Sequence, residues 1–258
     1  MKTQVVIIGQ QCLTLAQKAE MWSVYKCFYH YSEQYFMERI PQNTHFSLYL
    51  HNGKIVGFTG LRIDKTKANG RRQWMMYLGQ TVVTRQYRGQ SLLPTTVLLL
   101  AMKYWKELLT SDAWCWYDAL SYKAYLACAK CVPDCYPSHR TETPLHVQQV
   151  RDFVGKARYG DAYCAQTGTV AKEVNYLNDA SVNVFDEDLQ DPDVAFFAQA
   201  NPHYAAGHGL LVLAPFNRRN VFNLAVRYFG RLVNGRKTAA KMGKPSGEPA
   251  HYFLRSQS

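Results

Sequence analysis

The chain has 258 residues, of which 47% are hydrophobic and 14% aromatic, and it carries a formal net charge of +11. This length and composition predict one large or two small globular domains and exclude a disordered chain. No apolar run approaches the roughly 18 residues of a membrane-spanning helix. The opening residues, with one lysine and four consecutive aliphatic side chains, argue against a secretory signal.

The positive charge is concentrated toward the C-terminal end of the chain. Residues 218–258 contain nine lysines and arginines and one acid, whereas residues 1–217 contain 21 basic and 18 acidic side chains. Such a segment predicts an anionic partner without specifying its kind. The seven cysteines are an odd number without a recognisable secretion signal, so we expect reduced thiols in a cytoplasmic protein.

The first third of the chain predicts a strand, a helical region and a β-meander. Residues 3–9 favour a strand, and residues 13–38 repeat apolar side chains at helical spacing. Residues 45–63 contain two β-rich runs around His51-Asn52-Gly53, and Asn-Gly is the pair that a type I′ hairpin turn prefers. A polar loop is expected over 64–72, and a third strand follows over 73–84.

The remaining elements alternate between helices and strands. The pattern predicts a helix over 90–109 with Pro94 in its first turn, where the missing N–H costs nothing. Further along the chain we expect a strand at 113–120, helices at 121–130 and 146–157, a strand at 168–174, an exposed acidic loop at 185–193, a strand at 207–216, an amphipathic helix at 218–234 and a loose tail at 235–258.

This order of elements predicts a mixed α/β fold and not a doubly wound parallel sheet. An antiparallel meander runs into one strand–helix–strand unit. We expect residues 1–217 to form a single domain with an insertion at about 133–208, followed by the basic helix and tail of residues 218–258.

The segment "TVVTRQYRGQSLLPTT", residues 81–96, joins a strand to the start of a helix. Successive N–H groups at a helix start converge on one point, and the helix dipole adds positive charge there. Arg85 and Arg88 supply full charges, Gly89 allows close backbone approach, and Ser91 is expected to cap the helix. The segment therefore predicts a pyrophosphate-binding turn, and the alternative is an ordinary basic strand–helix turn.

The same segment resembles the acyl-CoA loop of the GNAT superfamily of N-acyltransferases. Val83, Tyr87, Arg88 and Gly89 match the family pattern. The chain departs from it where Arg85 replaces a proline, Ser91 a second glycine and Leu93 a small residue. The resemblance covers residues 1–132 and 210–216. It implies a mostly antiparallel sheet with one splayed parallel pair and helices on both faces.

The resemblance also implies where an acyl-CoA would bind. The thioester is expected between strands 77–84 and 113–119, with the backbone N–H groups of Val82 and Val83 stabilising the tetrahedral oxyanion. The expected pyrophosphate-binding residues are Arg85, Arg88, Gly89, Gln90 and Ser91. Acetyl-CoA or a longer acyl-CoA is the expected co-substrate, and no metal is expected.

The proton-transfer residues are less clearly indicated than the loop. In the family an asparagine opens the next helix and a tyrosine seven residues on acts as acid, which places Ser121 and Cys128 at these positions. Tyr122 and Tyr125 lie nearby in the sequence and are candidate substitutes, the alternative being packed aromatic side chains. Asp118, at the end of its strand, is a candidate base or amine ligand, or else a helix cap.

Two further groups of residues are candidates for a chemical role. Cys128, Cys131, Cys135 and His139 have spacings compatible with a Cys₃His zinc site, although semi-buried thiols are the alternative that we favour. His203 and His208 precede a strand, and one of them is a candidate general base, the alternative being loop histidines without a chemical role.

The helix at 218–234 separates two kinds of side chain. Val221, Phe222, Ala225, Tyr228, Phe229 and Leu232 form one side, and Arg219, Arg227, Arg231 and Asn234 lie on the other. A terminal helix packed on the sheet is one interpretation. An anionic membrane surface, with peripheral association at the inner membrane, or an acidic acyl carrier protein are the others. No nucleic-acid-binding motif is present, so nucleic acid is not expected as a partner.

Two functional hypotheses follow. In the first, the chain is an N-acyltransferase that moves an acyl group from acyl-CoA or an acyl carrier protein to a small-molecule or peptide amine by direct attack. Its extra length resembles longer family members that load fatty acyl chains onto amino acids, where added elements shape an acyl tunnel. In the second, the chain is a catalytically inactive GNAT-like module that binds CoA or associates with a membrane.

Overall fold

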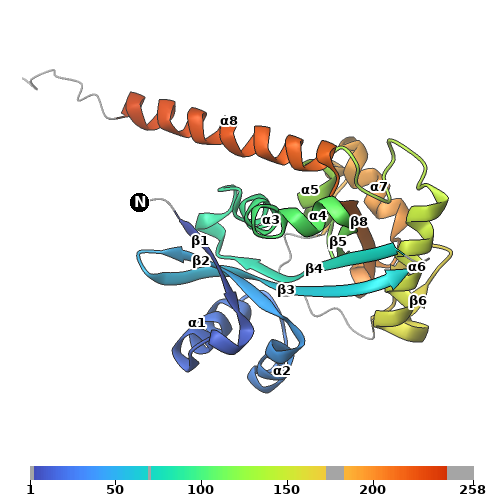
Figure 1. Ribbon diagram of the computed structural model, residues 1–258, viewed down its shortest axis with the longest axis horizontal. Coiled ribbons are helices and arrows are strands. Elements are labelled where there is room, and N and C mark those ends of the chain that lie inside the picture. The colour runs from blue at the N-terminus through green and yellow to red at the C-terminus, as the bar shows by residue number, and fades with distance from the viewer. Residues whose placement is uncertain (1–2, 69–70, 173–182, 243–258) are drawn as a thin grey trace, which may run out of the picture.

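The computed structural model describes residues 3–68, 71–172 and 183–242, and its core is one eight-stranded sheet (Figure 1). The strands lie in the order β1-β2-β3-β4-β5-β8-β7-β6. The strand bounds are β1 Gln4–Gly9, β2 His45–His51, β3 Lys54–Ala68, β4 Arg71–Val83, β5 Asp112–Ala119, β6 Tyr163–Cys164, β7 Thr169–Val170 and β8 Gly209–Pro215. All neighbouring pairs are antiparallel except β4 and β5, so the predicted mixed sheet with one parallel pair is confirmed.

Helices cover both faces of the sheet, as predicted (Figure 1). Their bounds are α1 Leu15–Tyr25, α2 Glu33–Arg39, α3 Leu92–Lys103, α4 Trp105–Thr110, α5 Tyr122–Ala129, α6 Leu145–Tyr159, α7 Pro192–Ala200 and α8 Arg218–Met242. Apolar side chains of α1, α2 and α6 pack on one face of the sheet, and those of α3, α5, α7 and α8 pack on the other.

The meander forms as the sequence predicts, with one extension. Asn52 and Gly53 both have positive φ, at 52° and 77°, which is the signature of a type I′ turn. The polar stretch expected to be a loop over 64–72 instead extends the second hairpin. β3 and β4 stay paired out to Ala68 and Arg71. Pairing along a long two-stranded ribbon overrides the low strand propensity of these polar residues.

Three predicted helices have different bounds in the structure. The helical region 13–38 is two helices, α1 and α2. The helix predicted over 90–109 begins at Leu92 and breaks at Tyr104, whose ring packs against Trp74 at a centroid distance of 4.9 Å. The C-terminal helix continues beyond residue 234 to Met242. Its last turns contain good helix formers that outweigh the cost of Gly235.

The segment 133–208 supplies α6, β6, β7 and α7. Of the strand predicted at 168–174, only Thr169–Val170 forms β7, and residues 173–174 lie outside the described residues, as do residues 243–258 of the predicted tail. Sequence analysis missed α7, although Asp191 caps it and Pro192 opens it.

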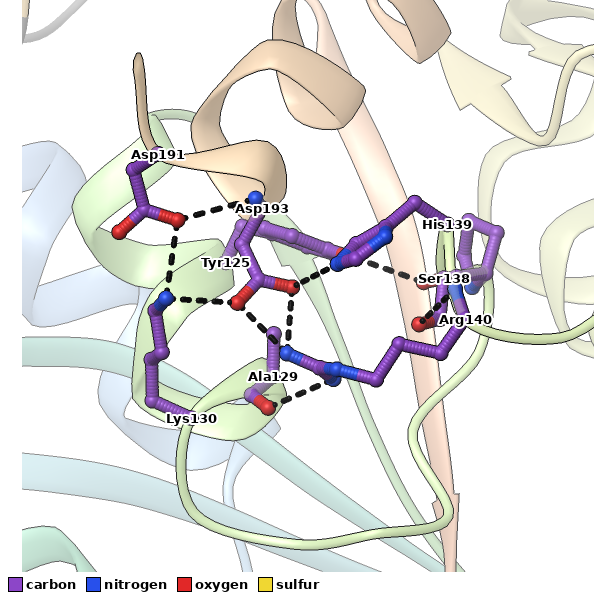
Figure 2. Close-up of polar contacts among 9 residues, drawn as sticks. Tyr125, Ala129, Lys130, Ser138, His139, Arg140, Asp191 and Asp193 are labelled. Carbon is purple, nitrogen blue, oxygen red and sulfur yellow. Dashed lines mark hydrogen bonds and ion pairs between the residues drawn. The ribbon is translucent and has the colours of Figure 1, made fainter. Parts of the chain in front are cut away.

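One buried carboxylate ties this segment to the core of the fold (Figure 2). Asp193, only 1% exposed, accepts hydrogen bonds from Arg140, whose Nη2 lies 2.6 Å from both carboxylate oxygens. Lys130, in the turn after α5, approaches the same carboxylate at 2.9 Å, and His139 approaches it at 3.2 Å. The network therefore joins α7, the 138–140 loop and the end of α5.

We expect Asp193→Asn to lower the free energy of unfolding by about 2–3 kcal/mol, because it removes the only negative charge between Arg140 and His139 in the described network. Lys130→Gln is the control, since Lys130 is 45% exposed and its loss should cost less than about 1 kcal/mol. Urea unfolding measures both, and equal effects of the two variants would contradict the anchoring role of Asp193.

Candidate active site

The only parallel strand pair of the described sheet separates along its length, as the resemblance implied. Its register runs from Gln73–Asp112 to Tyr77–Trp116 and stops there. β4 nevertheless stays paired with β3 as far as Val83, and β5 stays paired with β8 as far as Ala119. Because alternate peptide groups point to opposite edges of a strand, backbone groups beyond the last pair face an open gap.

A β-bulge in β4 lies beside this gap. Gly79 pairs with Gly60 and Val82 with Phe58, so Gln80 and Thr81 together oppose Thr59. Gln80 has a left-handed backbone with φ 51°. The extra residue reverses the side-chain alternation, and Val82 packs with the α1–α2 cluster whereas Val83 packs on the α3 side.

The gap opens into a cavity of about 550 Å³. Both Val82 and Val83 line it, together with the loop that leads into α3. The opposite end is lined by Tyr77, Asp118 and side chains of the α1–α2 connection. The cavity therefore runs from the predicted phosphate-binding turn, past the splayed strands, to the far face of the sheet.

The turn itself has the geometry of an anion-binding loop. A short 3₁₀ helix, Arg85–Tyr87, precedes Gly89, which has φ 78° and needs glycine for this backbone conformation. Within the described residues, the N–H groups of Gly89, Gln90 and Leu92 donate no backbone hydrogen bond. These groups lie at the positive end of the α3 dipole, where they can receive a phosphate.

Ser91 occupies its position for a different reason from the one predicted. Its backbone is left-handed, with φ 59° and ψ 32°, and its side chain forms no capping hydrogen bond with α3. The expectation of a hydroxyl cap is therefore wrong, because the serine backbone here does not have the extended conformation of a capping residue. Ser91 adopts the conformation that glycine would adopt without strain, which explains the glycine of the family pattern.

The two loop arginines differ in their surroundings. Arg88 Nε donates to the carbonyl oxygen of Val83 at 3.1 Å, and its guanidinium lies 5.2 Å from the centre of the Phe28 ring. It therefore lines the cavity and braces the loop against β4. Arg85 is exposed and does not line the cavity. Tyr87 packs with Tyr49, Val56 and Leu92, which makes it a structural residue of the loop.

Asp118 lies on the face of the sheet that α1, α2 and α6 cover. Its carboxylate is 3.0 Å from Lys172 Nζ and accepts a hydrogen bond from the Tyr77 hydroxyl at 3.4 Å. Burial and the nearby Asp118 charge raise the pKa of Tyr77 and of Tyr159, whose hydroxyl also bonds Asp118. Ser121, and not Asp118, caps α5, since its hydroxyl accepts from Ala124 N–H. Asp118 therefore does not serve as a helix cap, and it lines the cavity as a carboxylate paired with Lys172.

The other three catalytic candidates lie outside the cavity. The Tyr125 hydroxyl donates to the carbonyl oxygen of Pro137 at 3.1 Å in the buried layer beside α7 (Figure 2). The Tyr122 hydroxyl points to Asp188, at 3.5 Å. Cys128 lines a separate apolar pocket of about 60 Å³ between α3, α5 and α8. The sequence alone does not show which side of a helix faces the gap, and none of these three side chains lines the cavity, although the pocket beside Cys128 shares Tyr117 and Cys131 with it.

Tyr117 is the residue that sequence reasoning missed. It precedes Asp118 on β5 and lines the cavity, and its hydroxyl donates to the Ala124 carbonyl oxygen at 3.0 Å, on the α5 side of the sheet. Burial raises the pKa of Tyr117 well above its usual value, which keeps the hydroxyl protonated. The available signal was strand alternation, which places neighbouring residues 117 and 118 on opposite faces.

The residues of the zinc alternative do not converge. His139 Nε2 is turned to Asp193, and Cys128 shares a hydrogen bond with Cys135 that helps to raise the pKa of Cys135. No group of three potential metal ligands occurs in the described part of the chain. All seven cysteines lie in described segments, and none forms a disulfide. His203 and His208 pack against each other, at 5.2 Å between ring centroids, and do not line the cavity.

Comparisons with known proteins relate the chain only to solved structures. No protein-family model and no curated protein matches it. A probable N-acyltransferase of unknown function from Enterococcus faecalis V583 superposes with a TM-score of 0.38 and a sequence identity of 13%. The match covers 50% of this chain but only 32% of that protein. A Trypanosoma brucei acetyltransferase has a TM-score of 0.37 and 16% identity, and the match covers 56% of this chain and 99% of the other. Glucosamine-6-phosphate N-acetyltransferase from Arabidopsis thaliana has a TM-score of 0.33 and 16% identity, and the match covers 45% of this chain and 82% of the other.

These likenesses are partial, so the class of fold is defined by the topology of this chain. The antiparallel meander, the bulge in β4, the single parallel pair that splays and the loop entering α3 form one arrangement. It is the mostly antiparallel α/β arrangement that the resemblance implied. The chain has a GNAT-like fold.

We expect Ser91→Gly to raise the free energy of unfolding by about 0.5–1 kcal/mol. Glycine removes the cost of a left-handed backbone, and part of this gain is lost to the greater freedom of glycine in the unfolded chain. Thr95→Gly, one turn further into α3, is the control and should lower stability. Thermal unfolding measures both, and a destabilised Ser91→Gly variant would contradict the strain at this position.

Proposed function

We propose that the chain is an N-acyltransferase that moves an acyl group from acyl-CoA, or from an acyl carrier protein, to a small-molecule or peptide amine. One observation carries the proposal: a single cavity joins the loop before α3, the unpaired edge of β4 and the carboxylate of Asp118. It offers an anion site, oxyanion donors and a proton acceptor along one path.

The end of the cavity near α3 suits the phosphates of CoA. The N–H groups of Gly89 and Gln90 and the charge of Arg88 lie at this end, and Lys123 lines the cavity from α5. A thioester arm extending from there would enter the gap between β4 and β5. N–H groups of β4 near Val82 and Val83 would then meet the thioester oxygen as it gains negative charge.

Tyr117 and Asp118 divide the proton transfers between the two faces of β5. The amine nitrogen attacks the thioester carbon, a C–N bond forms and the C–S bond breaks. Asp118, on the acceptor face, takes a proton from the amine, and Tyr117, on the α5 face, donates a proton to the departing thiolate. The attack is direct in this proposal, since the single cavity lets amine and thioester meet in the gap, and Cys128, the cysteine at the family's acid position, does not line it.

We expect acetyl-CoA, palmitoyl-CoA or free CoA to raise the melting temperature, because ligands that bind only the folded state stabilise it by mass action. With a panel of amines, thiol release from acyl-CoA should follow. Asp118→Asn should lower kcat by about 100-fold or more while the thermal shift with CoA remains.

The outcomes of this experiment separate the two functional hypotheses. A thermal shift without thiol release from any amine would favour the inactive CoA-binding module over the enzyme. No thermal shift with any of the three ligands would contradict CoA binding altogether. Tyr117→Phe is a second variant, and an unchanged kcat would remove Tyr117 from the mechanism while leaving the role of Asp118 in place.

A second, independent proposal concerns α8 and an anionic membrane surface. Leu224 packs into the body of the protein, whereas Phe222, Val226 and Phe229 are 71%, 54% and 59% exposed. The interpretation of α8 as a helix packed on the sheet puts Phe222 and Phe229 on the packed side, and the structure leaves both exposed. Exposed aromatic residues at helical spacing, on a helix that begins with two arginines, suit the interface of an anionic bilayer. Of the described helices, none has the length and apolar character needed to cross a membrane.

We expect the full chain to float with vesicles containing phosphatidylserine, and the combined substitutions Phe222→Ser, Val226→Ser and Phe229→Ser to weaken this binding by at least about tenfold. Neutral phosphatidylcholine vesicles are the control for the contribution of charge. Equal flotation of the substituted and original proteins would contradict the role of this helix face.

A further inference from the structure

The acceptor end of the cavity has aromatic walls. Tyr25, Tyr29 and Tyr31, from the end of α1 and the connection to α2, line it together with Tyr77. The Tyr25 and Tyr29 rings stack at 4.6 Å between centroids, and those of Tyr29 and Tyr31 lie 6.0 Å apart. Such a wall favours the apolar or aromatic part of a ligand over a fully polar one.

The charges that line the same cavity are mostly positive. Among the described residues, Arg39, Arg88, Lys123 and Lys172 line it, and Asp118 is the one carboxylate. An unmodified amine enters such a cavity as an ammonium ion, and a field of the same sign opposes its entry. An acceptor that carries an anionic group of its own enters with no net positive charge. Arg88 and Lys123 lie toward the phosphate end, and Lys172 is paired with Asp118. Arg39 is therefore the charge that disfavours simple amines and polyamines at the acceptor end.

Arg39 is the cation at the acceptor end that no described carboxylate neutralises. Lys172 is paired with Asp118 at 3.0 Å. Arg39 Nη1 donates to the Tyr35 hydroxyl at 2.9 Å, and among the described residues its guanidinium forms no ion pair with a carboxylate. Half-buried guanidinium groups usually gain stability from bidentate anionic partners.

The backbone of Arg39 is held in a defined place. It ends α2, and its carbonyl oxygen accepts from Asn43 Nδ2 at 3.2 Å. Asn43 also donates to Gln80 Oε1, at 3.0 Å, in the bulge of β4. The end of α2 is thus tied to the strand edge where the thioester is expected, which sets the position of Arg39 relative to the reacting atoms.

Arg39 and Asp118 have opposite effects on the pKa of the same two tyrosines. The Asp118 charge raises the pKa of both Tyr29 and Tyr77, and the Arg39 charge lowers both. For Tyr29, burial is the larger cause and the resulting pKa is about 12. Tyr77 donates to Asp118, and Arg39 lines the same cavity, so a carboxylate suited to an amine and a guanidinium suited to an anion both belong to the acceptor end.

We propose that Arg39 binds an anionic group of the acceptor, and that the acceptor is an amine bearing a carboxylate or phosphate next to an apolar or aromatic portion. This inference rests on the proposed acyl transfer and specifies its substrate class. The amine lies toward Asp118 and the thioester, the anionic group lies on Arg39, and the apolar portion packs against Tyr29 and Tyr31. The ordinary alternative is that Arg39 only compensates the dipole at the end of α2.

The test compares acceptors with and without an anionic group. With acetyl-CoA and with palmitoyl-CoA as donors, thiol release is measured with phenylalanine and phenylalaninamide, which differ only in the carboxylate, and with O-phosphoethanolamine, which carries a phosphate but no aromatic portion. We expect the original protein to prefer an anionic acceptor over phenylalaninamide by about 10- to 100-fold in kcat/KM. Turnover of O-phosphoethanolamine at or above that of phenylalanine would contradict the need for an apolar portion and leave the anionic group as the recognised feature.

Arg39→Gln should reduce this preference to within about threefold, whereas Arg39→Lys should retain part of it. Lys26→Gln is the matched control. Lys26 is an exposed cation next to the same tyrosine wall that does not line the cavity, so its loss should leave the preference unchanged. Melting temperatures of all variants report whether the fold is intact. An unchanged preference in Arg39→Gln, or equal turnover of phenylalaninamide by the original protein, would overturn the proposal.

A binding measurement keeps this inference separate from the acyl transfer on which it rests. Isothermal titration of phenylalanine and O-phosphoethanolamine into the CoA-bound protein needs no turnover. Binding that Arg39→Gln weakens about 10-fold or more, without thiol release, would support the anion site and contradict the enzyme. Thiol release from amines without an anionic group, together with no effect of Arg39→Gln, would support the enzyme and contradict the anion site.

Discussion

The site depends on the way in which β4 and β5 are held apart. Each strand is anchored on its outer side, β4 by β3 and β5 by β8, while their mutual pairing stops at Tyr77 and Trp116. Neither strand can close the gap without breaking its outer ladder. Unpaired backbone groups inside a protein are costly, so a gap of this kind persists only where the outer pairing is strong enough to maintain it. The backbone groups in the gap are then preorganised for a bound carbonyl group.

The side chains that line the gap are distributed between the two faces of the sheet. Consecutive side chains of a strand point in opposite directions, so Tyr117 and Asp118 serve opposite faces although they are neighbours in the chain. The bulge at Gln80 does the same for Val82 and Val83 on β4. A donor that enters from α3 and an acceptor that enters beside α1 and α2 can therefore meet in the gap without sharing a binding surface.

The acceptor end is built from segments that lie far apart in the sequence. Tyr159 and Lys172 come from the segment 133–208, and Arg39 comes from the end of α2. The segment 133–208 is itself joined to α5 through the buried carboxylate of Asp193 (Figure 2). The excess of positive charge around Asp118 is thus a property of the assembled fold.

The sequence by itself determined the sheet meander, the parallel unit and the position of the loop that leads into α3, because these depend on local signals. Asn52-Gly53, the β-branched runs and Pro94 near a helix start each act over a few residues. The same local reasoning put Asp118 at the end of a strand. It did not reveal which helical side chains face the gap, and Tyr122, Tyr125 and Cys128 all face elsewhere. The left-handed backbone of Ser91, the exposure of Phe222 and Phe229, and the meeting of Arg39, Tyr77 and Asp118 at one cavity were decided only by the tertiary structure. Each of these features depends on contacts between distant segments, so it cannot be predicted from the sequence pattern of a single helix or strand.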